Sequence, residues 1–387
     1  MKVFIIAGEV SGDKLGGSLM AGLRQLEPEV KFDGVGGELM EGQGLASRFP
    51  MQELSVMGLV EILPKYFHFK RRIRELAKTI VKDQPDVLIT IDSPEFGLRV
   101  AKAVKSKSDI RTVHYVAPSV WAWRPKRADR MAAFIDQVLA LLPFEPPFME
   151  KAGMRCDFVG HPVVTETQAS EAEASEFRLR HGIGDAPMVL VLPGSRKGEV
   201  TRLSPIFREV LLEALNTQDN LRIVVPAAKP VAGLVEEMVK QWDLPTNVQI
   251  LDPRDFGIDK ALTEKLSAFK AADVALAASG TVSLELAAAG TPMVIAYDMN
   301  PISRYLITKM LRVDTATLVS LVSDTRVIPE FLGKDCEPQF IAPALIDVLE
   351  NPRDQIDAMR TTMSRLGAGG EDPGLKAARA VLDGLQA

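Results

Sequence analysis

Short apolar runs alternate with longer stretches of helical periodicity along most of the chain. This alternation is typical of parallel strands with helices packed on both faces of each sheet, so the α/β fold class is predicted. The strand candidates of the first half are residues 3–7, 32–35, 87–91, 112–116, 138–142 and 157–159. Those of the second half are residues 189–192, 222–225, 248–251, 274–276 and 293–296, and only helices are expected after Glu337.

Two doubly wound domains are predicted, because the strand pattern stops and restarts on either side of a polar stretch. Residues 165–175 read TETQASEAEAS and show no apolar periodicity, which indicates an interdomain linker. The predicted organisation is an N-terminal domain at 1–165, a linker at 166–175, a C-terminal domain at 176–345 and a helical tail at 346–387. The tail could pack on its own N-terminal domain or on a partner chain, which leaves a homodimer open.

Composition narrows the function classes. The 387 residues suffice for two α/β domains, and the net charge of −5 argues against a general nucleic-acid binder. The two cysteines, Cys156 and Cys336, have no metal-like spacing and indicate a reduced, cytoplasmic compartment. The chain begins with a strand pattern and holds no apolar run of membrane-spanning length, so we expect neither a signal peptide nor a membrane span.

One run, residues 277–297, combines a small-residue turn, a helix start and an acidic side chain. Ser279, Gly280 and Thr281 follow an apolar strand and open a helix, where backbone N–H groups and the helix dipole favour phosphate. Glu285 follows one helical turn after Thr281, where its carboxylate can accept hydrogen bonds from ribose hydroxyls. The run therefore fits a nucleoside diphosphate. The alternative is an ordinary N-cap with an exposed glutamate.

Two further loops follow predicted strands, where parallel sheets bind ligands. The first reads Gly8-Glu9-Val10-Ser11-Gly12-Asp13 and lacks the G-x-G-x-x-G dinucleotide fingerprint. A capped glycine turn explains its glycines and Ser11 but not Glu9. In the second loop, Ser195 and Arg196 follow Gly194, and a guanidinium can bond two diphosphate oxygens at once. The alternative for the second loop is a solvated basic turn.

Asp92 ends the apolar run 87–91, just before Pro94. It is either a simple N-cap of the next helix or a general base that takes a proton from an attacking hydroxyl. No metal or other cofactor is expected, because the chain has no D-x-D pair and its four histidines are scattered. A cationic side chain and helix N-termini can stabilise a departing diphosphate instead. His114 and His161 are expected to be core or turn residues.

Residues 57–74 carry bulky apolar side chains on two helical faces beside a basic cluster. Core packing explains one face, whereas two faces with positive charge fit a surface that meets acyl chains and anionic headgroups. The expected membrane or acyl contacts are Leu63, Phe67, Phe69, Lys70, Arg71 and Arg72. Trp121 and Trp123 either line an acyl or acceptor route or pack beneath their loop.

Several motifs together resemble the lipid-A-disaccharide synthase family, over residues 2 to about 345. They read AGEVSGD (7–13), IDSPEF (91–96), HYVAPSVWAWRPKR (114–127), LPFE (142–145), VGHP (159–162), LPGSR (192–196) and AASGTVSLELAAAGTPMV (277–294). The resemblance implies the GT-B architecture, in which two Rossmann-like domains face each other across a cleft. The N-terminal domain would serve the acceptor and the membrane, and the C-terminal domain the UDP-sugar.

The resemblance also implies the reaction, an inverting transfer of 2,3-diacylglucosamine from UDP to 2,3-diacylglucosamine 1-phosphate (lipid X). The products would be UDP and the β-1,6-linked lipid A precursor, formed at the anionic cytoplasmic face of a Gram-negative inner membrane. The resemblance assigns the general base to Asp92, and it matches the further catalytic candidates Glu9 and Ser11 to the first glycine loop, where acceptor or donor sugar hydroxyls could be held. It assigns nucleotide binding to Arg196, Ser195, Ser279, Gly280, Thr281, Glu285 and Asn300.

Three alternatives stay open. Another UDP-sugar enzyme of this architecture, such as a 2-epimerase or a different lipid-acceptor glycosyltransferase, would share the 277–294 motif but would not explain HYVAPSVWAWR. A nicotinamide-dependent oxidoreductase is disfavoured by the missing glycine fingerprint. A non-catalytic membrane-binding module would need only the basic apolar segment, and Asp92 and Arg196 would then be dispensable.

Overall fold

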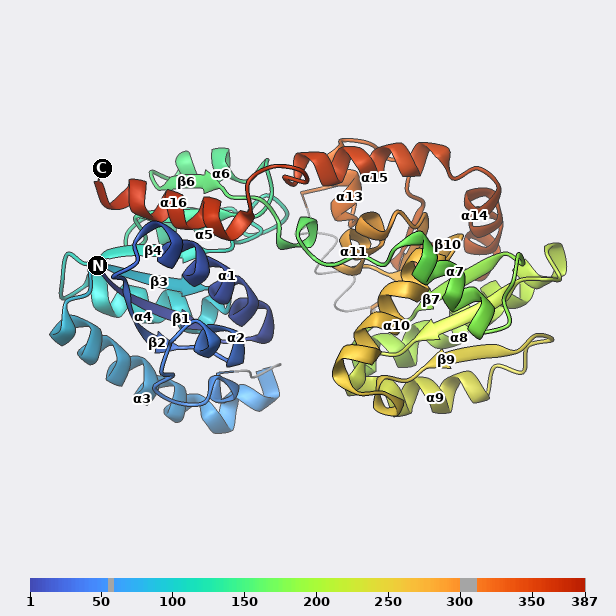
Figure 1. Cartoon of the computed structure of the whole chain (residues 1–387), viewed down its shortest axis with the longest axis horizontal. Coiled ribbons are helices and arrows are strands. Elements are labelled where there is room, and N and C mark those ends of the chain that lie inside the picture. The colour runs from blue at the N-terminus through green and yellow to red at the C-terminus, as the bar shows by residue number, and fades with distance from the viewer. Residues whose placement is uncertain (55–58, 300–311, 387) are drawn as a thin grey trace. The chain divides into compact units, whose positions relative to one another are not determined.

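The computed structural model describes residues 1–54, 59–299 and 312–386. Within them the chain divides into two compact units, each built on a six-stranded sheet (Figure 1). The first unit contains Met1–Thr165 and Leu366–Ala387, and the second contains Glu166–Arg365. Every pairing between neighbouring strands is parallel, which confirms the predicted α/β class.

The first unit begins with the chain's N-terminal strand. Its strands are β1 (Lys2–Ala7), β2 (Lys31–Val35), β3 (Val87–Ile91), β4 (Arg111–Tyr115), β5 (Gln137–Ala140) and β6 (Arg155–Phe158), in the spatial order β2-β1-β3-β4-β5-β6. Its helices are α1 (Val10–Leu26), α2 (Glu38–Gly42), α3 (Leu59–Asp83), α4 (Pro94–Lys105), α5 (Lys126–Met131), α6 (Pro146–Glu150) and α16 (Pro373–Gln386), with 3-10 turns η1 (Met51–Glu53) and η2 (Pro162–Val164).

The second unit repeats this plan. Its strands are β7 (Met188–Leu192), β8 (Arg222–Pro226), β9 (Val248–Leu251), β10 (Val274–Ala278), β11 (Met293–Tyr297) and β12 (Glu330–Leu332), in the order β12-β11-β10-β7-β8-β9. Its helices are α7 (Glu171–Arg180), α8 (Lys197–Thr217), α9 (Ala232–Lys240), α10 (Ile258–Ala271), α11 (Val282–Ala289), α13 (Leu318–Ser323), α14 (Pro338–Glu350) and α15 (Arg353–Arg365), with 3-10 turns η3 (Lys229–Val231), η4 (Pro253–Asp255) and η5 (Gly333–Asp335).

The strand order reverses once in each sheet. The chain runs outward from β1 to β2 and resumes with β3 on the other side of β1, and it runs from β7 to β9 and resumes with β10 on the other side of β7. Loops leave the carboxyl ends of two such strands in opposite directions, and ligands bind in the space that this opens. The loops at these reversal points are residues 8–9 and 92–93 in the first unit, and 193–196 and 279–281 in the second.

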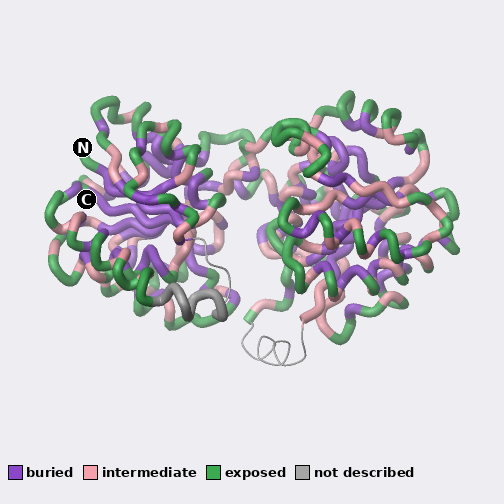
Figure 2. The backbone as a smooth tube through the Cα atoms, turned by 90° about the horizontal axis from the view of Figure 1, so that it is seen from below, coloured by how far each residue is buried: buried purple, intermediate pink, exposed green. Residues whose placement is uncertain are grey.

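The central strands are buried on both faces. Every residue of β3, β7 and β10 is buried, which is expected of parallel strands covered by helices on each side. Figure 2 shows these buried strands at the centre of each unit, with exposed positions on the surrounding helices. Each predicted strand overlaps an observed one. The unpredicted β12 has three partly exposed residues at a sheet edge and therefore lacks a detectable apolar run.

The segment expected to be a linker contains the start of a helix. Helix α7 begins at Glu171, and the Ser170 hydroxyl oxygen accepts a hydrogen bond from the Glu173 amide at 3.3 Å. The Glu173 carboxylate in turn accepts from the Ser170 amide at 2.8 Å. This reciprocal capping box stabilises the first turn of α7. The S-x-x-E signal is present in the sequence, but the polar composition around it favoured a linker.

The expected C-terminal tail is shared between the units. Helices α14 and α15 belong to the second unit, whereas α16 belongs to the first and lies along α1 (Figure 1). Glycines allow this close approach, since a Cβ atom built on Gly22 would lie 2.7 Å from the carbonyl oxygen of Gly374. The Gln137 side chain donates to the Ala380 carbonyl at 2.8 Å. Helix α16, at the C-terminal end of the chain, therefore packs in the same unit as β1, the first strand.

Candidate functional site

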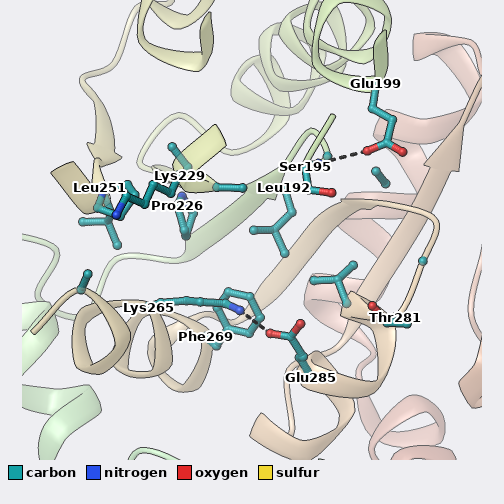
Figure 3. A pocket seen from close by; sticks show the side chains of 18 of the residues that line it. Leu192, Ser195, Glu199, Pro226, Lys229, Leu251, Lys265, Phe269, Thr281 and Glu285 are labelled. Atoms are coloured by element: carbon teal, nitrogen blue, oxygen red, sulfur yellow. Dashed lines mark hydrogen bonds and ion pairs between the residues drawn. The ribbon is translucent and has the colours of Figure 1, made fainter. Parts of the chain in front are cut away.

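The second unit holds a pocket of about 590 Å³ at the carboxyl ends of β7, β8, β9 and β10 (Figure 3). Apolar side chains form much of its wall, and a few charged ones point inward, as is typical of small-molecule sites. The pocket is lined by Leu192, Gly194, Ser195, Arg196, Glu199, Pro226, Ala227, Ala228, Lys229, Leu251, Pro253, Phe256, Ala261, Leu262, Glu264, Lys265, Phe269, Ala278, Ser279, Gly280, Thr281, Val282 and Glu285.

The pocket unites two segments expected to bind a nucleotide. Its lining includes Ser195, Arg196, Ser279, Gly280, Thr281 and Glu285. They meet because β7 pairs directly with β10, in the register Val189 to Val274, so the loops after both strands emerge together. Asn300, the remaining candidate, lies outside the described residues.

The loop after β7 is organised by Glu199, which the sequence did not single out. Its carboxylate oxygen Oε2 accepts from the amides of Ser195 and Arg196 at 3.0 and 3.2 Å, and Oε1 accepts from Nη1 of Arg196 at 3.1 Å. Gly194 has φ +115°, and a Cβ atom there would lie 2.6 Å from that of Glu199. An anion reaching these amides must compete with Glu199. The Arg196 side chain is 67% exposed and can turn toward such an anion.

Glu285 has an unforeseen partner across the pocket. Its carboxylate contacts the ammonium group of Lys265, which comes from α10 (Figure 3). Further lining residues that the sequence did not indicate, such as Lys229 and Phe256, follow β8 and β9. These positions belong to none of the motifs that the sequence indicated, so only the arrangement of the strands reveals them.

Helix α11 starts without a side-chain cap. Its N-cap residue is Thr281, which makes no side-chain capping hydrogen bond, so an ordinary capped helix start does not describe this end. The Ser283 hydroxyl donates instead to the Gly280 carbonyl at 3.0 Å. Gly280, Thr281 and Val282 line the pocket, so the positive end of the α11 dipole lies at the pocket wall, which suits an anion.

In the first unit, the catalytic candidates lie at the carboxyl ends of β1 and β3. The Ser11 hydroxyl lies 3.4 Å from Oδ2 of Asp92 and donates to it, although the two residues are far apart in sequence. Glu9 is the N-cap residue of α1, directly before the helix that carries Ser11. This grouping follows from the pairing of β1 with β3, which places Ala7 opposite Ile91.

Asp92 does not act as a helix cap. The N-cap residue of α4 is Ser93, and it makes no side-chain capping hydrogen bond. Asp92 and Ser93 have φ angles of +47° and +38°, a left-handed backbone that is costly for residues other than glycine, asparagine and aspartate. Such strain occurs often at functional sites, and here it turns the chain immediately after β3. Gly8 lies close by, since a Cβ atom on it would approach the Ser93 hydroxyl oxygen to 2.5 Å.

Asp13, by contrast, has a structural role. Its buried carboxylate accepts from the amides of Gly37, Leu39 and Met40 at 2.8 to 3.1 Å, and so caps the start of α2. Of the acidic residues in the first loop, Asp13 therefore caps α2, whereas Glu9 lies at the same end of the sheet as Asp92.

The two histidines expected to be core or turn residues are so placed. His114 is buried, with Nδ1 2.8 Å from the Thr90 hydroxyl oxygen. Burial and the positive charge of Arg127 lower the pKa of the His114 imidazole to about 3, so this histidine is neutral at physiological pH. His161 precedes η2, and its Nδ1 accepts from the Val163 amide at 3.2 Å.

Trp121 contacts the segment that follows β5. Its indole Nε1 donates to Glu145 at 3.2 Å, and its ring meets the ring of Phe144 edge-on at 5.1 Å. Glu145 is 3% exposed and also accepts from the Leu142 amide at 3.0 Å. Burial raises the pKa of the Glu145 carboxyl from its usual 4.5 to about 7. Trp123 is among the exposed large apolar side chains.

Glu145 is expected to make stability depend on pH. Because its pKa is higher in the folded than in the unfolded chain, its stabilising contribution is complete below pH 4.5 and is lost as the pH rises through about 7. Relative to Glu145→Gln, the wild type should lose on the order of 1–3 kcal/mol of unfolding free energy across this window. Urea unfolding of both proteins at either end of the window measures the change. A difference that does not vary with pH would contradict this expectation.

Helix α3 presents a basic stripe to solvent. Phe67 is 80% exposed, and Lys70, Arg71, Arg74 and Lys78 follow at helical spacing, all exposed. Leu63, expected beside them, has a side chain outside the described part of the structure.

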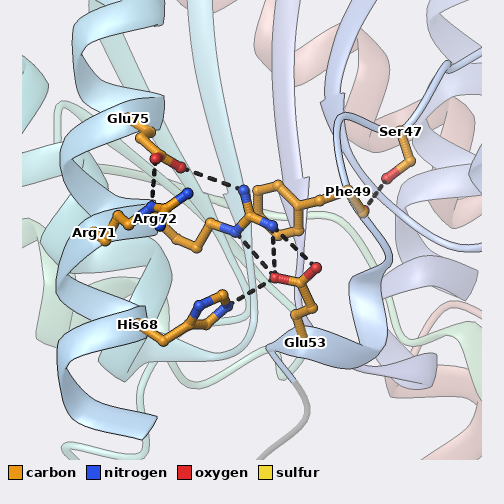
Figure 4. A network of polar contacts seen from close by, with 7 residues as sticks. All are labelled: Ser47, Phe49, Glu53, His68, Arg71, Arg72 and Glu75. Carbon is orange, nitrogen blue, oxygen red and sulfur yellow. Dashed lines mark hydrogen bonds and ion pairs between the residues drawn. The ribbon is translucent and has the colours of Figure 1, made fainter.

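Phe69 and Arg72 are placed differently from the expectation of membrane contacts. Phe69 packs edge-on against Phe96 of α4 at 5.9 Å and is partly buried. The Arg72 guanidinium pairs with Glu53 at 2.8 Å and lies 4.3 Å above the ring of Phe49 (Figure 4). Both side chains are on the helix face that packs on the protein, so they hold α3 in place instead of facing outward.

The described residues offer neither a metal-binding cluster nor a membrane-spanning helix. No group of three or more histidine, cysteine, aspartate or glutamate side chains there is gathered in a way that could hold a metal ion. In the same part of the chain, no helix is long and apolar enough to span a membrane.

The sequence is similar to known proteins over nearly its whole length. Residues 3–376 match the family described as lipid-A-disaccharide synthetase. The lipid-A-disaccharide synthase of Ruegeria pomeroyi is 61% identical over 385 residues, covering 100% of this chain and 96% of that protein. The corresponding enzyme of Rhodospirillum centenum is 44% identical, covering 98% and 94%.

The fold is similar to that of GT-B enzymes that use UDP-sugars. A UDP co-structure of MnaA from S. aureus has a TM-score of 0.65 at 14% identity, covering 98% of this chain and 94% of that one. The UDP-GlcNAc 2-epimerase of Neisseria meningitidis, solved with UDP-GlcNAc, has a TM-score of 0.61 at 12% identity and covers 100% of both chains. At this identity the likeness concerns the fold alone.

Proposed function

This chain belongs to the lipid-A-disaccharide synthase family of glycosyltransferases, and on that premise we propose that it transfers 2,3-diacylglucosamine from UDP to 2,3-diacylglucosamine 1-phosphate. The products are UDP and a β-1,6-linked disaccharide. The observation that carries this proposal is the pocket of the second unit, which gathers Ser195, Arg196, Ser279, Thr281 and Glu285 where a parallel sheet reverses its strand order.

In this proposal the pocket holds the UDP part of the donor. The Glu285 carboxylate accepts hydrogen bonds from ribose hydroxyls, and the amides at the start of α11 face the diphosphate. Arg196 adds a positive charge that can bond two phosphate oxygens. Preorganised donors of this kind stabilise the negative charge that develops on the leaving diphosphate.

Asp92 serves as the general base. Its carboxylate takes the proton of the acceptor 6-hydroxyl while that oxygen forms a bond to the anomeric carbon of the donor sugar. The bond from this carbon to the diphosphate oxygen breaks, and its electron pair leaves with UDP. Attack from the face opposite UDP inverts the configuration and gives the β linkage. Ser11 donates to Asp92 and so orients the carboxylate, and Glu9 lies at the same sheet edge as a candidate contact to sugar hydroxyls.

The test is a release assay with purified protein. UDP-2,3-diacylglucosamine is incubated with and without 2,3-diacylglucosamine 1-phosphate, and UDP and the disaccharide are quantified. We expect equal amounts of both products, and only when the acceptor is present. Release of UDP without acceptor, or interconversion of UDP-GlcNAc with its 2-epimer, would reject the transferase proposal in favour of hydrolysis or epimerisation.

We further propose that the exposed stripe of α3 docks on the anionic cytoplasmic face of the inner membrane, where both acylated substrates reside. Phe67 offers an apolar side chain, and Lys70, Arg71 and Arg74 offer positive charge on the same helix face. An apolar anchor beside basic residues is typical of interfacial helices.

Substitution of this stripe is expected to weaken membrane binding alone. Phe67→Ser combined with Lys70→Glu and Arg71→Glu should reduce co-sedimentation with anionic vesicles, because each basic residue near such a surface contributes about 1 kcal/mol. UDP affinity should be unchanged. The matched control is Phe69→Ser, which should lower thermal stability because Phe69 packs on Phe96. Unaltered sedimentation of the triple variant would reject docking through α3.

A further inference from the structure

Lys265 is a charged residue of the pocket without a role in the function proposed above. It lies on α10, and its ammonium group contacts the carboxylate of Glu285 on α11 (Figure 3). Both side chains line the same pocket. The pair therefore joins two helices at the proposed ribose contact.

Stability of the fold does not explain this pair. The side chains are 39% and 34% exposed, and ion pairs with such access to water contribute little to folding, about 0–1 kcal/mol. Comparable exposed pairs such as Lys240 with Glu236 lie along one helix on the surface. The pair of Lys265 and Glu285 differs because it lies inside a pocket.

The surroundings of Lys265 restrict where its ammonium group can be. Phe269 follows one turn later on α10, and the Lys265 ammonium nitrogen lies 5.1 Å from the centre of its ring. The ammonium group is thus held between an aromatic face and a carboxylate. It contacts oxygen Oε2 of Glu285, and Oε1 makes no hydrogen bond or ion pair with another of the described residues. That second oxygen is oriented by the contact and can accept from a hydroxyl.

The charges in the pocket also indicate that Lys265 is the partner of Glu285. The other acidic lining residues have partners of their own, since Glu199 accepts from Arg196 and Glu264 accepts from Arg180 and His181. For Glu285, Lys265 supplies the positive charge.

We propose that Lys265 is a positioning residue that holds the Glu285 carboxylate in the orientation that binds ribose. Lys265 thereby sets the preference of the pocket for ribonucleotides over 2′-deoxyribonucleotides. This inference rests on the proposed function, in that the pocket must bind a uridine nucleotide, and it adds a specificity determinant to that site.

The test compares two nucleotides in two variants by calorimetry. In Lys265→Met, affinity for UDP should fall about tenfold, the range for losing a partner of a charged hydrogen bond. Affinity for 2′-deoxy-UDP should fall less than about threefold, because that nucleotide lacks one hydroxyl for Glu285 to accept from. The matched control is Lys229→Met, which removes a positive charge from the same pocket without contacting Glu285. It should leave the ratio of the two affinities at the wild-type value.

A second comparison separates positioning from general charge. If Lys265 acts through Glu285, adding Lys265→Met to Glu285→Gln should not lower the ratio of UDP affinity to 2′-deoxy-UDP affinity any further. An equal loss for both nucleotides in Lys265→Met, or an unchanged ratio, would overturn the inference while leaving the proposed function intact. A wild-type protein that binds no UDP would overturn both.

Discussion

Asp92→Asn is expected to fold normally and to turn over roughly 10²-fold or more slowly than the wild type. General-base catalysis contributes on the order of 10²- to 10⁴-fold, and an amide oxygen cannot take up the proton of the attacking hydroxyl. Rates at saturating substrates, with a thermal melt of each protein, measure the effect. Loss of the base should lower kcat and leave substrate binding nearly intact.

The structure explains why the fold should survive this change. Asn tolerates the left-handed φ of +47° as well as Asp does, and its carbonyl oxygen can still accept from Ser11. Capping of α4 is not at stake either, because Ser93 occupies the N-cap position. The matched control is Glu95→Gln, which neutralises another carboxylate of the same motif. Glu95 is paired with Arg99 at 3.1 Å, and its loss should leave turnover unchanged.

A folded Asp92→Asn protein with near-normal turnover would remove Asp92 from the mechanism. Glu9 would then be the next candidate, because it lies at the same edge of the first sheet. A similar slowing in Glu95→Gln would mean that the motif is sensitive to any change of charge, and the assignment of the base would lose its support.

Arg196→Ala and Glu285→Ala should each weaken UDP binding by about 1–3 kcal/mol, the cost of removing one partner of a charged hydrogen bond. In Arg196→Ala, Glu199 keeps its bonds to the amides of Ser195 and Arg196, so the loop should keep its shape and the loss should reflect the guanidinium alone. Glu285→Ala leaves Lys265 without its partner in the pocket.

Calorimetric titration with UDP measures both variants. Lys240→Ala is the control, since it removes an exposed positive charge of α9 that does not line the pocket. Its affinity for UDP should equal that of the wild type. Unchanged affinity in both Arg196→Ala and Glu285→Ala would reject the nucleotide assignment of the pocket.

Local sequence patterns predicted much of the fold. The largely apolar runs of 87–91, 189–192 and 274–276 predicted central strands because residues buried on both sheet faces are mostly apolar. The pattern failed where that requirement is absent, as in β12 at a sheet edge, and where a polar stretch hid a capping box, as in α7.

The residues of the candidate site likewise include some that the sequence predicted and some that it did not. Ser279, Gly280 and Thr281 were recognisable because a glycine turn at the start of a helix is a local feature. Lys265 was not, because its partner Glu285 is brought near only by folding. Glu199 was missed although its contacts are local, since it accepts from the amides of Arg196 and Ser195, which precede it by three and four residues.

The sequence by itself determined the two parallel sheets, the loops at their carboxyl ends and the family, since each depends on residues that are neighbours along the chain. Only the tertiary structure decided that Ser11 donates to Asp92, that Lys265 meets Glu285, and that α16 returns to α1. It also decided that Phe67 faces solvent while Phe69 faces α4. The physical reason is that these contacts depend on the order of the strands in the sheet and on which face of a helix packs on its neighbour. Neither property can be predicted from residues that are close together in sequence.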